Sequence, residues 1–274
     1  MTVTAVIEDQ VLPDLPPRRR PGGRGGRLAG RVALVSGAAG ALGSTLVARF
    51  AAEGAAVLAT DQDLPRCQQV VAQTVQSEPG ARVLAAALDV TDGQQWTRAL
   101  RLARRSLGPV DLLVNNAGTV DLARLDAVTP DDWQRLVAVN QTAVLTGIQR
   151  CLPTMWQAGG GSVVNIGSVF GLVGTGGSFA YHATKGALIS MTTAAAVELA
   201  RRRVRVNAVL PGLVPTPMTA DLPADFVAGY VAATPLARLA SCEDVAAAVV
   251  FLASDEADFI TGVCLPVDGG YTAR

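Results

Sequence analysis

The sequence predicts an α/β fold: a doubly wound parallel sheet of about seven strands, with helices on both faces. Short continuous apolar runs such as Val32–Val35 are typical of strands that are buried on both faces. These runs alternate with longer segments of helical composition, which favours parallel strands joined by right-handed crossovers. A glycine-rich turn, residues 37–43, follows the first apolar run directly and opens a helix.

The elements are expected in strict alternation. Each expected strand is rich in Val, Ile, Leu and Ala, and the longer helical segments between them contain residues such as Ala, Leu, Gln and Arg. Strands are expected at 32–35, 55–60, 83–87, 110–114, 162–166, 204–210 and 263–267, and helices at 42–53, 64–76, 93–107, 130–158, 179–200 and 243–253.

Composition favours one large soluble domain. The chain has 274 residues, of which 50% are hydrophobic and 17% charged, so a sizeable core is possible. Lysine plus arginine and aspartate plus glutamate both number 23, and aromatic residues make up 4%. This balance argues against nucleic acid or an anionic membrane as a partner. No apolar run is long enough to cross a membrane.

Residues 1–29 differ from the rest of the chain and predict a disordered tail, followed by a single domain over residues 30–274. Arginine, proline and glycine dominate the segment, which cannot bury enough apolar surface to order itself. A basic docking arm is the alternative. The apolar region of a signal peptide is missing, and a twin-arginine signal is disfavoured because a glycine-rich spacer follows the arginines.

The cysteines predict buried, reduced thiols in a cytoplasmic protein. Cys67, Cys151, Cys242 and Cys264 are scattered along the chain, and the sequence holds a single histidine, His182. This pattern lacks the spacing of a zinc site, so no metal is expected.

The glycine-rich turn has the context of a phosphate-binding turn. Gly37, Gly40 and Gly43 stand between an expected strand and an expected helix, whose amino-terminal amides favour an anion. Asp61 ends the second strand, eighteen residues after Gly43. A carboxylate at about that separation reaches the ribose hydroxyls of a dinucleotide. A purely structural turn is the alternative.

The stretch from Ser168 to Lys185 carries the acid–base chemistry. Tyr181 and Lys185 are four residues apart, so a helix places both side chains on one face. A cation one turn away favours the phenolate and is expected to lower the pKa of Tyr181, which makes the phenol a usable general acid or base. Taken alone, the pair could equally be surface neighbours.

Three further stretches place polar groups or turn residues within or after expected elements. Residues 115–118, Asn-Asn-Ala-Gly, follow one strand, and Pro211–Gly212 with Thr216 follow another. In an open α/β sheet these carboxyl ends form the ligand-binding edge. Asn140 interrupts an expected long helix, which predicts a kink or a buried hydrogen bond.

Together these motifs resemble the compact, single-domain branch of the short-chain dehydrogenases/reductases. The resemblance covers about residues 28–271 and rests on the glycine turn, Asp61, Asp89–Val90, residues 115–118, Asn140, Ser168, Tyr181 with Lys185, Pro211–Gly212 and residues 268–270. It implies a Rossmann-type sheet with strand order 3-2-1-4-5-6-7.

The resemblance also implies roles for individual residues. The catalytic set would be Asn140, Ser168, Tyr181 and Lys185, with Asn140 holding a water on a proton path. The dinucleotide would be held by Gly37, Gly40, Ala41, Leu42, Gly43, Asp61, Asp89, Val90, Asn116, Ala117, Gly118, Tyr181, Lys185, Pro211, Gly212, Val214 and Thr216. The substrate would contact Ser168, Phe170, Val173, Phe179, Tyr181 and Met218.

Two departures from the family pattern concern the glycine turn. Ser36 stands where the family usually has threonine, and Ala41 stands where its middle glycine is expected. The spacing of Gly37, Gly40 and Gly43 is similar to that of the longer, epimerase-type branch, but the length and residues 115–118 favour the compact branch. Ala41 adds a methyl group where the backbone is expected to approach a pyrophosphate closely.

The expected activity is NAD-dependent interconversion of a secondary alcohol and a ketone. Asp61 would repel the 2′-phosphate of NADP, and the expected substrate lining offers Leu172, Leu222 and Phe226 but no Arg or Lys to clamp an anion. The substrate is therefore expected to be uncharged and fairly apolar, and cyclic or steroid-like. An NADPH-dependent 3-oxoacyl thioester reductase and a catalytically silent dinucleotide-binding regulator are the alternatives. The resemblance implies a homotetramer.

Overall fold

The computed structural model describes residues 26–273, and its centre is one parallel sheet of seven strands in the order β3-β2-β1-β4-β5-β6-β7. This confirms the predicted fold class and strand order. The strands are β1 (Val32–Ser36), β2 (Ala56–Asp61), β3 (Val83–Ala87), β4 (Leu112–Asn115), β5 (Gly161–Ile166), β6 (Val204–Pro211) and β7 (Cys264–Val267).

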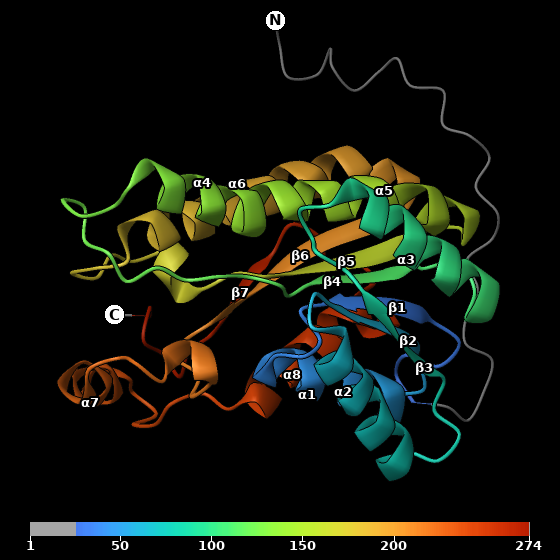
Figure 1. Ribbon diagram of the computed structural model, residues 1–274, viewed down its shortest axis with the longest axis horizontal. Coiled ribbons are helices and arrows are strands. Elements are labelled where there is room, and N and C mark those ends of the chain that lie inside the picture. Colours follow the sequence, from blue (N-terminus) through green and yellow to red (C-terminus); the bar gives the residue numbers. More distant parts are fainter. Residues whose placement is uncertain (1–25, 274) are drawn as a thin grey trace, which may run out of the picture.

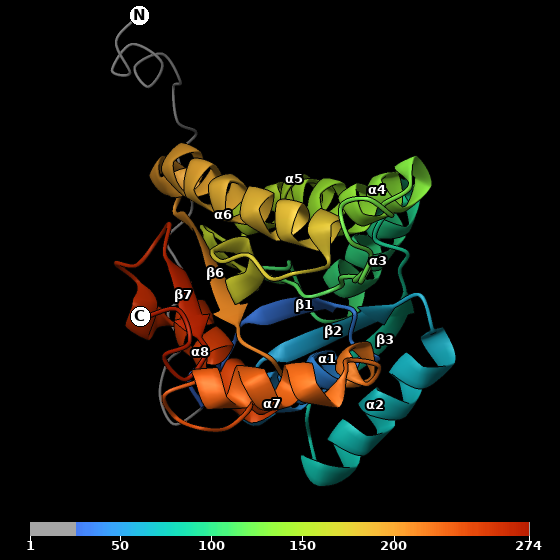
Figure 2. The ribbon, with the colours of Figure 1, turned by 90° about the vertical axis from the view of Figure 1, so that its left-hand side faces the viewer.

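Helices cover both faces of the sheet. Figures 1 and 2 show α3, α4, α5 and α6 over one face and α1, α2 and α8 over the other. Within the described part of the chain, no helix has both the length and the apolar character needed to cross a bilayer. The helices are α1 (Ala41–Ala52), α2 (Leu64–Ser77), α3 (Gly93–Ser106), α4 (Pro130–Val137), α5 (Ala143–Gln157), α6 (Phe179–Leu199), α7 (Ala224–Ala233) and α8 (Cys242–Ala253).

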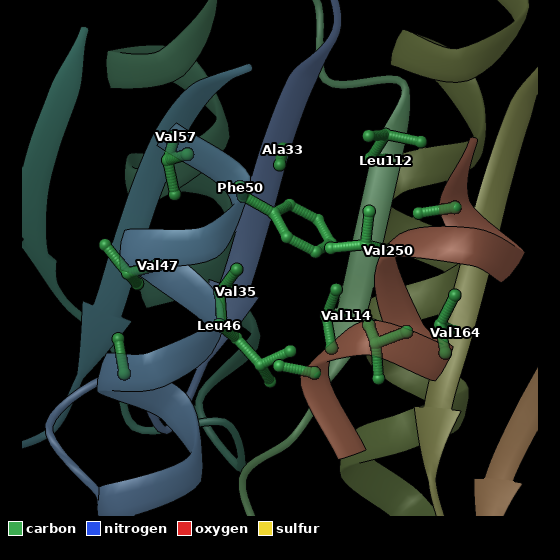
Figure 3. Packing of buried hydrophobic residues seen from close by; sticks show 14 of the residues in the cluster. Ala33, Val35, Leu46, Val47, Phe50, Val57, Leu112, Val114, Val164 and Val250 are labelled. Carbon is green, nitrogen blue, oxygen red and sulfur yellow. The ribbon is translucent and has the colours of Figure 1, made fainter. Parts of the chain in front are cut away.

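Each face of the sheet buries its own apolar cluster, because the strands point alternate side chains to opposite faces. Figure 3 shows the cluster under α1 and α8, where Phe50 of α1 lies over the sheet and faces Val250 of α8. Phe50 and Trp96 are the largest fully buried side chains of the two clusters. The buried strands explain why the sequence shows continuous apolar runs instead of alternation.

Local capping fixes where several helices begin. The side chain of Thr129 accepts a hydrogen bond from the backbone N–H of Asp132, and Pro130 occupies the first turn of α4. Ser241 and Asp244 form a reciprocal capping box at the start of α8. Such caps satisfy amide groups that the first helical turn leaves without an intrahelical partner.

The expected helix over 130–158 consists of two α-helices joined by a π turn, Ala138–Thr142, which contains Asn140. The predicted irregularity at Asn140 is therefore present. In contrast, α7 was not predicted, because its sequence contains Gly229 and β-branched residues and follows a proline-rich loop. Figure 2 shows α7 in the foreground, at the level of α1 and α8, and Figure 1 shows it at the left-hand edge of the molecule.

The folded domain begins earlier than predicted. Leu28 is fully buried in the cluster under α1 and α8, and its backbone N–H donates to the carbonyl of Glu53 at 2.9 Å. The Arg27 guanidinium donates to the carboxylate of Glu256 at 2.7 and 2.8 Å. Residues 26–29, assigned to the tail from composition, are thus packed against the domain. The remainder of the predicted tail, residues 1–25, lies outside the described residues.

Replacing Leu28 with alanine should lower the free energy of unfolding by about 3 kcal/mol, because it removes a fully buried side chain and leaves a cavity. Urea denaturation followed by circular dichroism measures the change. Leu125→Ala is the matched control: Leu125 is 69% exposed, so its loss should cost about 0.5 kcal/mol or less. Equal effects of the two substitutions would contradict the assignment of Leu28 to the core.

Candidate active site

A cleft of about 1020 Å³ opens at the carboxyl ends of the strands. Its volume suits a dinucleotide together with a small substrate. All the residues that the family resemblance assigned to the dinucleotide line this one cleft, as do Ser168, Phe170 and Met218 from the other assignments. The topology explains the convergence, since parallel strands bring their carboxyl ends to the same edge.

The glycine-rich turn fits a dinucleotide phosphate. Gly37 has φ +64°, and a Cβ atom at Gly43 would overlap the carbonyl oxygen of Gly37, so neither position suits a larger residue. Helix α1 follows with Gly40 at its N-cap and without a side-chain cap, which leaves its first amides facing the cleft. Ala41 is the first helical residue and lines the cleft, so the turn accommodates its methyl group.

Ser36 joins the glycine turn to the segment after β4. Its hydroxyl donates to the carbonyl of Val114 at 3.3 Å and accepts from the backbone N–H groups of Asn116 and Ala117 at 3.0 and 3.1 Å. The amide of Asn116 in turn donates to the carbonyls of Ser36 and Gly37. A serine hydroxyl therefore provides the bonds expected of a threonine here, and the Ser36 departure leaves the turn intact.

Asp61 ties β2 to the glycine turn. Its carboxylate accepts from the backbone N–H of Ala39 at 2.9 Å and from that of Asp63 at 3.0 Å. Asp61 and Gln62 line the cleft together with Arg66 of α2. Arg66, in the first turn of α2, thus brings a cation to the same wall as Asp61.

Asp89 and Val90 form the neighbouring wall, and α3 holds them in place. The backbone N–H of Asp89 donates to the side chain of Gln95 at 2.8 Å, and the indole of Trp96 donates to the carbonyl of Val90 at 3.0 Å. Both residues line the cleft, as the resemblance implied.

Three of the residues predicted to be catalytic, Ser168, Tyr181 and Lys185, lie together between β5 and α6. Ser168 follows β5 and caps a short 3₁₀ turn, Val169–Gly171, and its hydroxyl makes a hydrogen bond with Tyr181. The ammonium of Lys185 lies 5.5 Å from the centroid of the Tyr181 ring and donates to the carbonyl of Ile166 at 2.9 Å. A Cβ at Gly171 would lie 2.6 Å from the carbonyl oxygen of Lys185, so the 3₁₀ turn packs directly on α6.

Burial dominates the protonation of both groups. Burial raises the pKa of Tyr181 to about 12, although the hydrogen bond with Ser168 acts in the opposite direction. Burial also lowers the pKa of Lys185 to about 8. The expected lowering of the Tyr181 pKa is therefore not found in this structure, because desolvation of the phenol outweighs the hydrogen bond that favours its charged form.

Asn140 lies behind the cleft wall, with 1% of its surface exposed. Its side-chain oxygen accepts from the backbone N–H of Thr119 at 2.9 Å, and its amide donates to the Thr119 carbonyl and the Thr184 hydroxyl. A Cβ at Gly118 would lie 3.4 Å from this oxygen and 3.8 Å from the Lys185 nitrogen, so all three meet at one point. The π turn presents Asn140 to this point.

The end of β6 and the segment that follows it close the cleft at the end nearest α7. Pro211, Gly212, Val214 and Thr216 all line it. A Cβ at Gly212 would come within 2.6 Å of the Tyr230 hydroxyl of α7, so this position has no room for a side chain. Thr216 opens the turn Pro217–Thr219, which carries Met218 into the lining.

The predicted substrate residues divide into two groups. Phe170, Met218, Leu222 and Phe226 lie in the cleft wall, whereas Leu172, Val173 and Phe179 are outside it. The structure therefore does not bring Val173 and Phe179 to the cleft with the other predicted substrate residues, because nearness in sequence does not fix the direction of a side chain. Phe179 instead faces the ring of Trp133 on α4, with their centroids 6.4 Å apart.

The part of the cleft wall that includes residues 119–122 was not predicted from the sequence. Thr119, Val120, Leu122, Arg135 and Val139 all line the cleft. Arg135 corrects the expectation of a lining without a cation at the substrate end. Its guanidinium is engaged by the Thr119 hydroxyl at 3.2 Å and by the carboxylates of Asp121 and Asp132 at 3.4 and 3.2 Å. Arg135 reaches the cleft because α4 packs beside α6, and no motif in the local sequence predicts this placement.

Comparisons with known proteins agree with this geometry. The family model described as Enoyl-(Acyl carrier protein) reductase matches residues 37–272. The chain is 41% identical over 246 residues to 2,5-dichloro-2,5-cyclohexadiene-1,4-diol dehydrogenase LinX of Sphingobium indicum, covering 90% of this chain and 98% of the relative. It is 41% identical over 248 residues to 3-alpha-(or 20-beta)-hydroxysteroid dehydrogenase of Mycobacterium tuberculosis, covering 90% and 92%.

A third relative is the 3-oxoacyl-[acyl-carrier-protein] reductase FabG of Thermotoga maritima, 38% identical over 244 residues that cover 89% of this chain and 98% of the relative. Among solved structures, a short-chain type dehydrogenase/reductase from Mycobacterium marinum superposes with a TM-score of 0.86 at 30% identity, covering 90% of this chain and 97% of that one. With the motifs and the cleft they line, these matches establish that the chain belongs to the short-chain dehydrogenase/reductase family and is an oxidoreductase of that type.

Proposed function

We propose that the protein is an NAD-dependent dehydrogenase that interconverts a secondary alcohol and a ketone on an uncharged, fairly apolar, cyclic or steroid-like substrate. The observation that carries the proposal is the Tyr181 hydroxyl, hydrogen-bonded with Ser168 and one turn from the buried Lys185, in a cleft that also holds the glycine turn. A proton-transferring group and a dinucleotide cradle thus share one cavity.

The nicotinamide ring of the bound dinucleotide supplies or accepts the hydride. Tyr181 would give its proton to the substrate oxygen in reduction and take it back in oxidation. Ser168 would donate a hydrogen bond to the same oxygen and stabilise the charge that develops on it. Lys185, fixed by the Ile166 carbonyl, would favour the phenolate when charged and hold ribose hydroxyl groups.

Asn140 would complete the proton path by holding a water near Lys185. Its side-chain oxygen faces the same point beside Gly118 as the Lys185 nitrogen. A carbonyl oxygen has two lone pairs and can accept two hydrogen bonds. The side-chain oxygen of Asn140 accepts one of them from the backbone N–H of Thr119. One acceptor site on Asn140 is then available for a bridging water.

The cleft walls support an apolar substrate. Phe170, Leu122, Met218 and Phe226 contribute large apolar groups, and Leu122 and Met218 are 46% and 49% exposed. The charge of Arg135 is offset by the carboxylates of Asp121 and Asp132, which form ion pairs with its guanidinium. The relatives whose names give cyclic diols or hydroxysteroids as substrates fit this lining.

A second candidate is reduction of a 3-oxoacyl thioester with NADPH. It is favoured by the similarity to FabG and by Arg66, whose position on the wall beside Asp61 could partly offset the repulsion of a 2′-phosphate. We place it second, because the carboxylate of Asp61 is fixed at the end of β2 by two backbone amides. A silent dinucleotide-binding regulator is disfavoured by the assembled Ser168, Tyr181 and Lys185.

We further propose a homotetramer in the cytoplasm. Large apolar side chains are exposed on α5 and α6, where Leu145 is 47%, Phe179 43% and Val197 70% accessible in the single chain. Such a surface favours association, and light scattering of the purified protein would test it. The four cysteines are free, as expected in a reducing compartment.

Tyr181→Phe should remove nearly all turnover and leave the dissociation constant of NADH almost unchanged, because only the proton-transferring oxygen is lost. A panel of cyclic alcohols and hydroxysteroids, followed by absorbance of reduced nicotinamide, measures turnover, and NADH fluorescence measures binding. Wild-type kcat in the variant would refute the assignment of Tyr181.

Lys185 is the only lysine in the sequence, so [¹⁵N]lysine labelling should give one side-chain signal whose titration reports a pKa of about 8. Because folding lowers this pKa, the charged form costs stability below about pH 8, and the cost disappears as the pH rises toward 10.5. The full effect is about 3 kcal/mol.

Relative to Lys185→Met, the wild type should therefore gain stability between pH 8 and 9.5. Urea denaturation of both proteins at each pH measures the difference, and the methionine variant controls for all other titrating groups. A difference that stays constant over this interval, or a lysine signal that titrates near its ordinary pKa, would refute a strongly desolvated Lys185.

The unmodified enzyme should prefer NAD over NADP by at least tenfold in kcat/KM, about 1.4 kcal/mol of discrimination. Asp61→Asn should reduce this ratio by weakening repulsion of the 2′-phosphate, and Gln62→Arg should recruit NADP by adding a cation beside it. Steady-state kinetics with both cofactors measure the ratio. Equal use of both cofactors by the unmodified protein would favour the thioester reductase instead.

A further inference from the structure

A loop, residues 172–178, joins the Ser168 turn to α6, and its second half forms part of the cleft wall. Thr175, Gly176, Gly177 and Ser178 of this substrate loop line the cleft. We propose that His182, one residue beyond Tyr181, is a positioning residue that clasps the substrate loop and thereby sets affinity for the bulky part of the substrate. This inference rests on the proposed function, in which that end of the cleft receives the substrate.

The hydrogen bonds of His182 define the clasp. The backbone N–H of Thr175 donates to Nε2 at 3.1 Å, and the Thr175 hydroxyl lies 3.2 Å from the same atom. Nδ1 lies 2.9 Å from the carbonyl oxygen of Ser178. A carbonyl only accepts and a main-chain amide only donates, so the ring is neutral with its proton on Nδ1. One imidazole thus joins both ends of the segment 175–178.

The loop needs such a clasp, because its backbone is otherwise weakly determined. Ser178 adopts φ +56°, which is strained for a residue with a side chain. The φ angles of Gly174 and Gly176 lie outside the left-handed region, and no atom lies within 4 Å of the place where a Cβ would stand. Neither the backbone conformation nor the packing therefore requires glycine at these two positions. The two glycines therefore add freedom that the loop must lose on ordering.

The His182 ring also supports a cleft residue directly. It stacks on Phe170, with centroids 5.3 Å apart and planes at 24°. The edge of Phe170 in turn meets Tyr230 of α7 at 6.3 Å and 89°. Phe170 lines the cleft, whereas His182 is outside the lining. His182 consequently acts on the substrate through Phe170 and the loop, without contacting the reacting atoms.

The clasp reaches the opposite wall through the loop. The backbone N–H of Ser178 donates to the carbonyl of Leu122 at 3.4 Å, and the N–H of Phe179 donates to that of Ala123 at 3.1 Å. Leu122 is itself part of the cleft lining. The position of residues 175–178 therefore determines how far apart the two apolar walls stand, which is the property that selects substrate size.

Two variants separate the hydrogen bonds from the ring. His182→Phe keeps a flat ring against Phe170 but loses both polar atoms, and His182→Gln keeps an amide that can donate and accept. In His182→Phe, amide hydrogen exchange of residues 172–178 should accelerate by about tenfold or more, because local opening becomes easier. Exchange of residues 186–198 in α6 should stay unchanged, and His182→Gln should recover most of the protection.

Kinetics test the consequence for substrate. In His182→Phe the KM for a hydroxysteroid such as androsterone should rise about tenfold, as expected from the loss of two hydrogen bonds that order the wall. The kcat should change less than threefold and the NADH dissociation constant less than twofold, because the lost interaction is common to bound substrate and transition state. Cyclohexanol, too small to reach the loop, should show a smaller change in KM.

Each possible outcome of these two experiments either supports or refutes the role proposed for His182. Unchanged exchange in the loop, or exchange accelerated equally throughout α6, would refute the clasp. Faster loop exchange with unchanged KM for the steroid would refute the role in substrate affinity. Should the wild type turn over neither alcohol, the proposed substrate class fails for the probes, whereas the exchange measurement still confirms or refutes the clasp.

Discussion

The rest of the site depends on one constraint, which is that the ammonium group of Lys185 is buried. It is fixed by the carbonyl of Ile166, at the carboxyl end of a central strand, and one helical turn from Tyr181. Desolvation disfavours the charged form of Lys185, so keeping the ammonium buried lowers the free energy of unfolding. Gly171 lets the turn after Ser168 pack on the backbone of Lys185, where a Cβ would lie 2.6 Å from the Lys185 carbonyl oxygen. The predicted catalytic residues are thus arranged around a buried charge that costs the folded protein stability.

Buried polar side chains make the ligand-binding edge rigid. The amide of Asn115 on β4 donates to Asn165 on β5, whose amide donates to Thr192 on α6. Ser36 and Asn116 form a second set between β1 and β4. Because each group is satisfied, these networks cost little and specify one register at the strand ends. The loops beyond them, which line the substrate end, are free to differ in sequence without disturbing the cofactor end.

The cofactor end was largely predictable from sequence, since its residues follow short apolar runs that are typical of buried strands. Gly37, Asp61, Asn116 and Pro211 converge because parallel strands share a carboxyl edge. The spacing of Tyr181 and Lys185 likewise determined their common helical face. Even the irregularity at Asn140 was indicated by a poor helix former in a long helix.

The substrate end was less predictable, because packing between distant elements places its residues. Arg135 reaches the cleft only because α4 lies beside α6, and Phe179 leaves it because its helix turns the ring toward Trp133. Desolvation reversed the expected shift in the pKa of Tyr181, and burial depends on the whole fold. Leu28 was assigned to the tail because composition is averaged over a window that its neighbours dominate.

The π turn at residues 138–142 fixes how many residues the chain must have between α4 and α5. One residue corresponds to about 100° of rotation in an α-helix. Removing a residue between Ala138 and Thr142 would restore uninterrupted α geometry but would rotate α4 against α5 by that angle. Trp133 would then leave Phe179, and Arg135 would leave Thr119. Among related sequences the positions of this stretch other than Asn140 should therefore tolerate substitutions far better than insertions or deletions, so that aligned length here marks an intact site as well as the identity of Asn140 does.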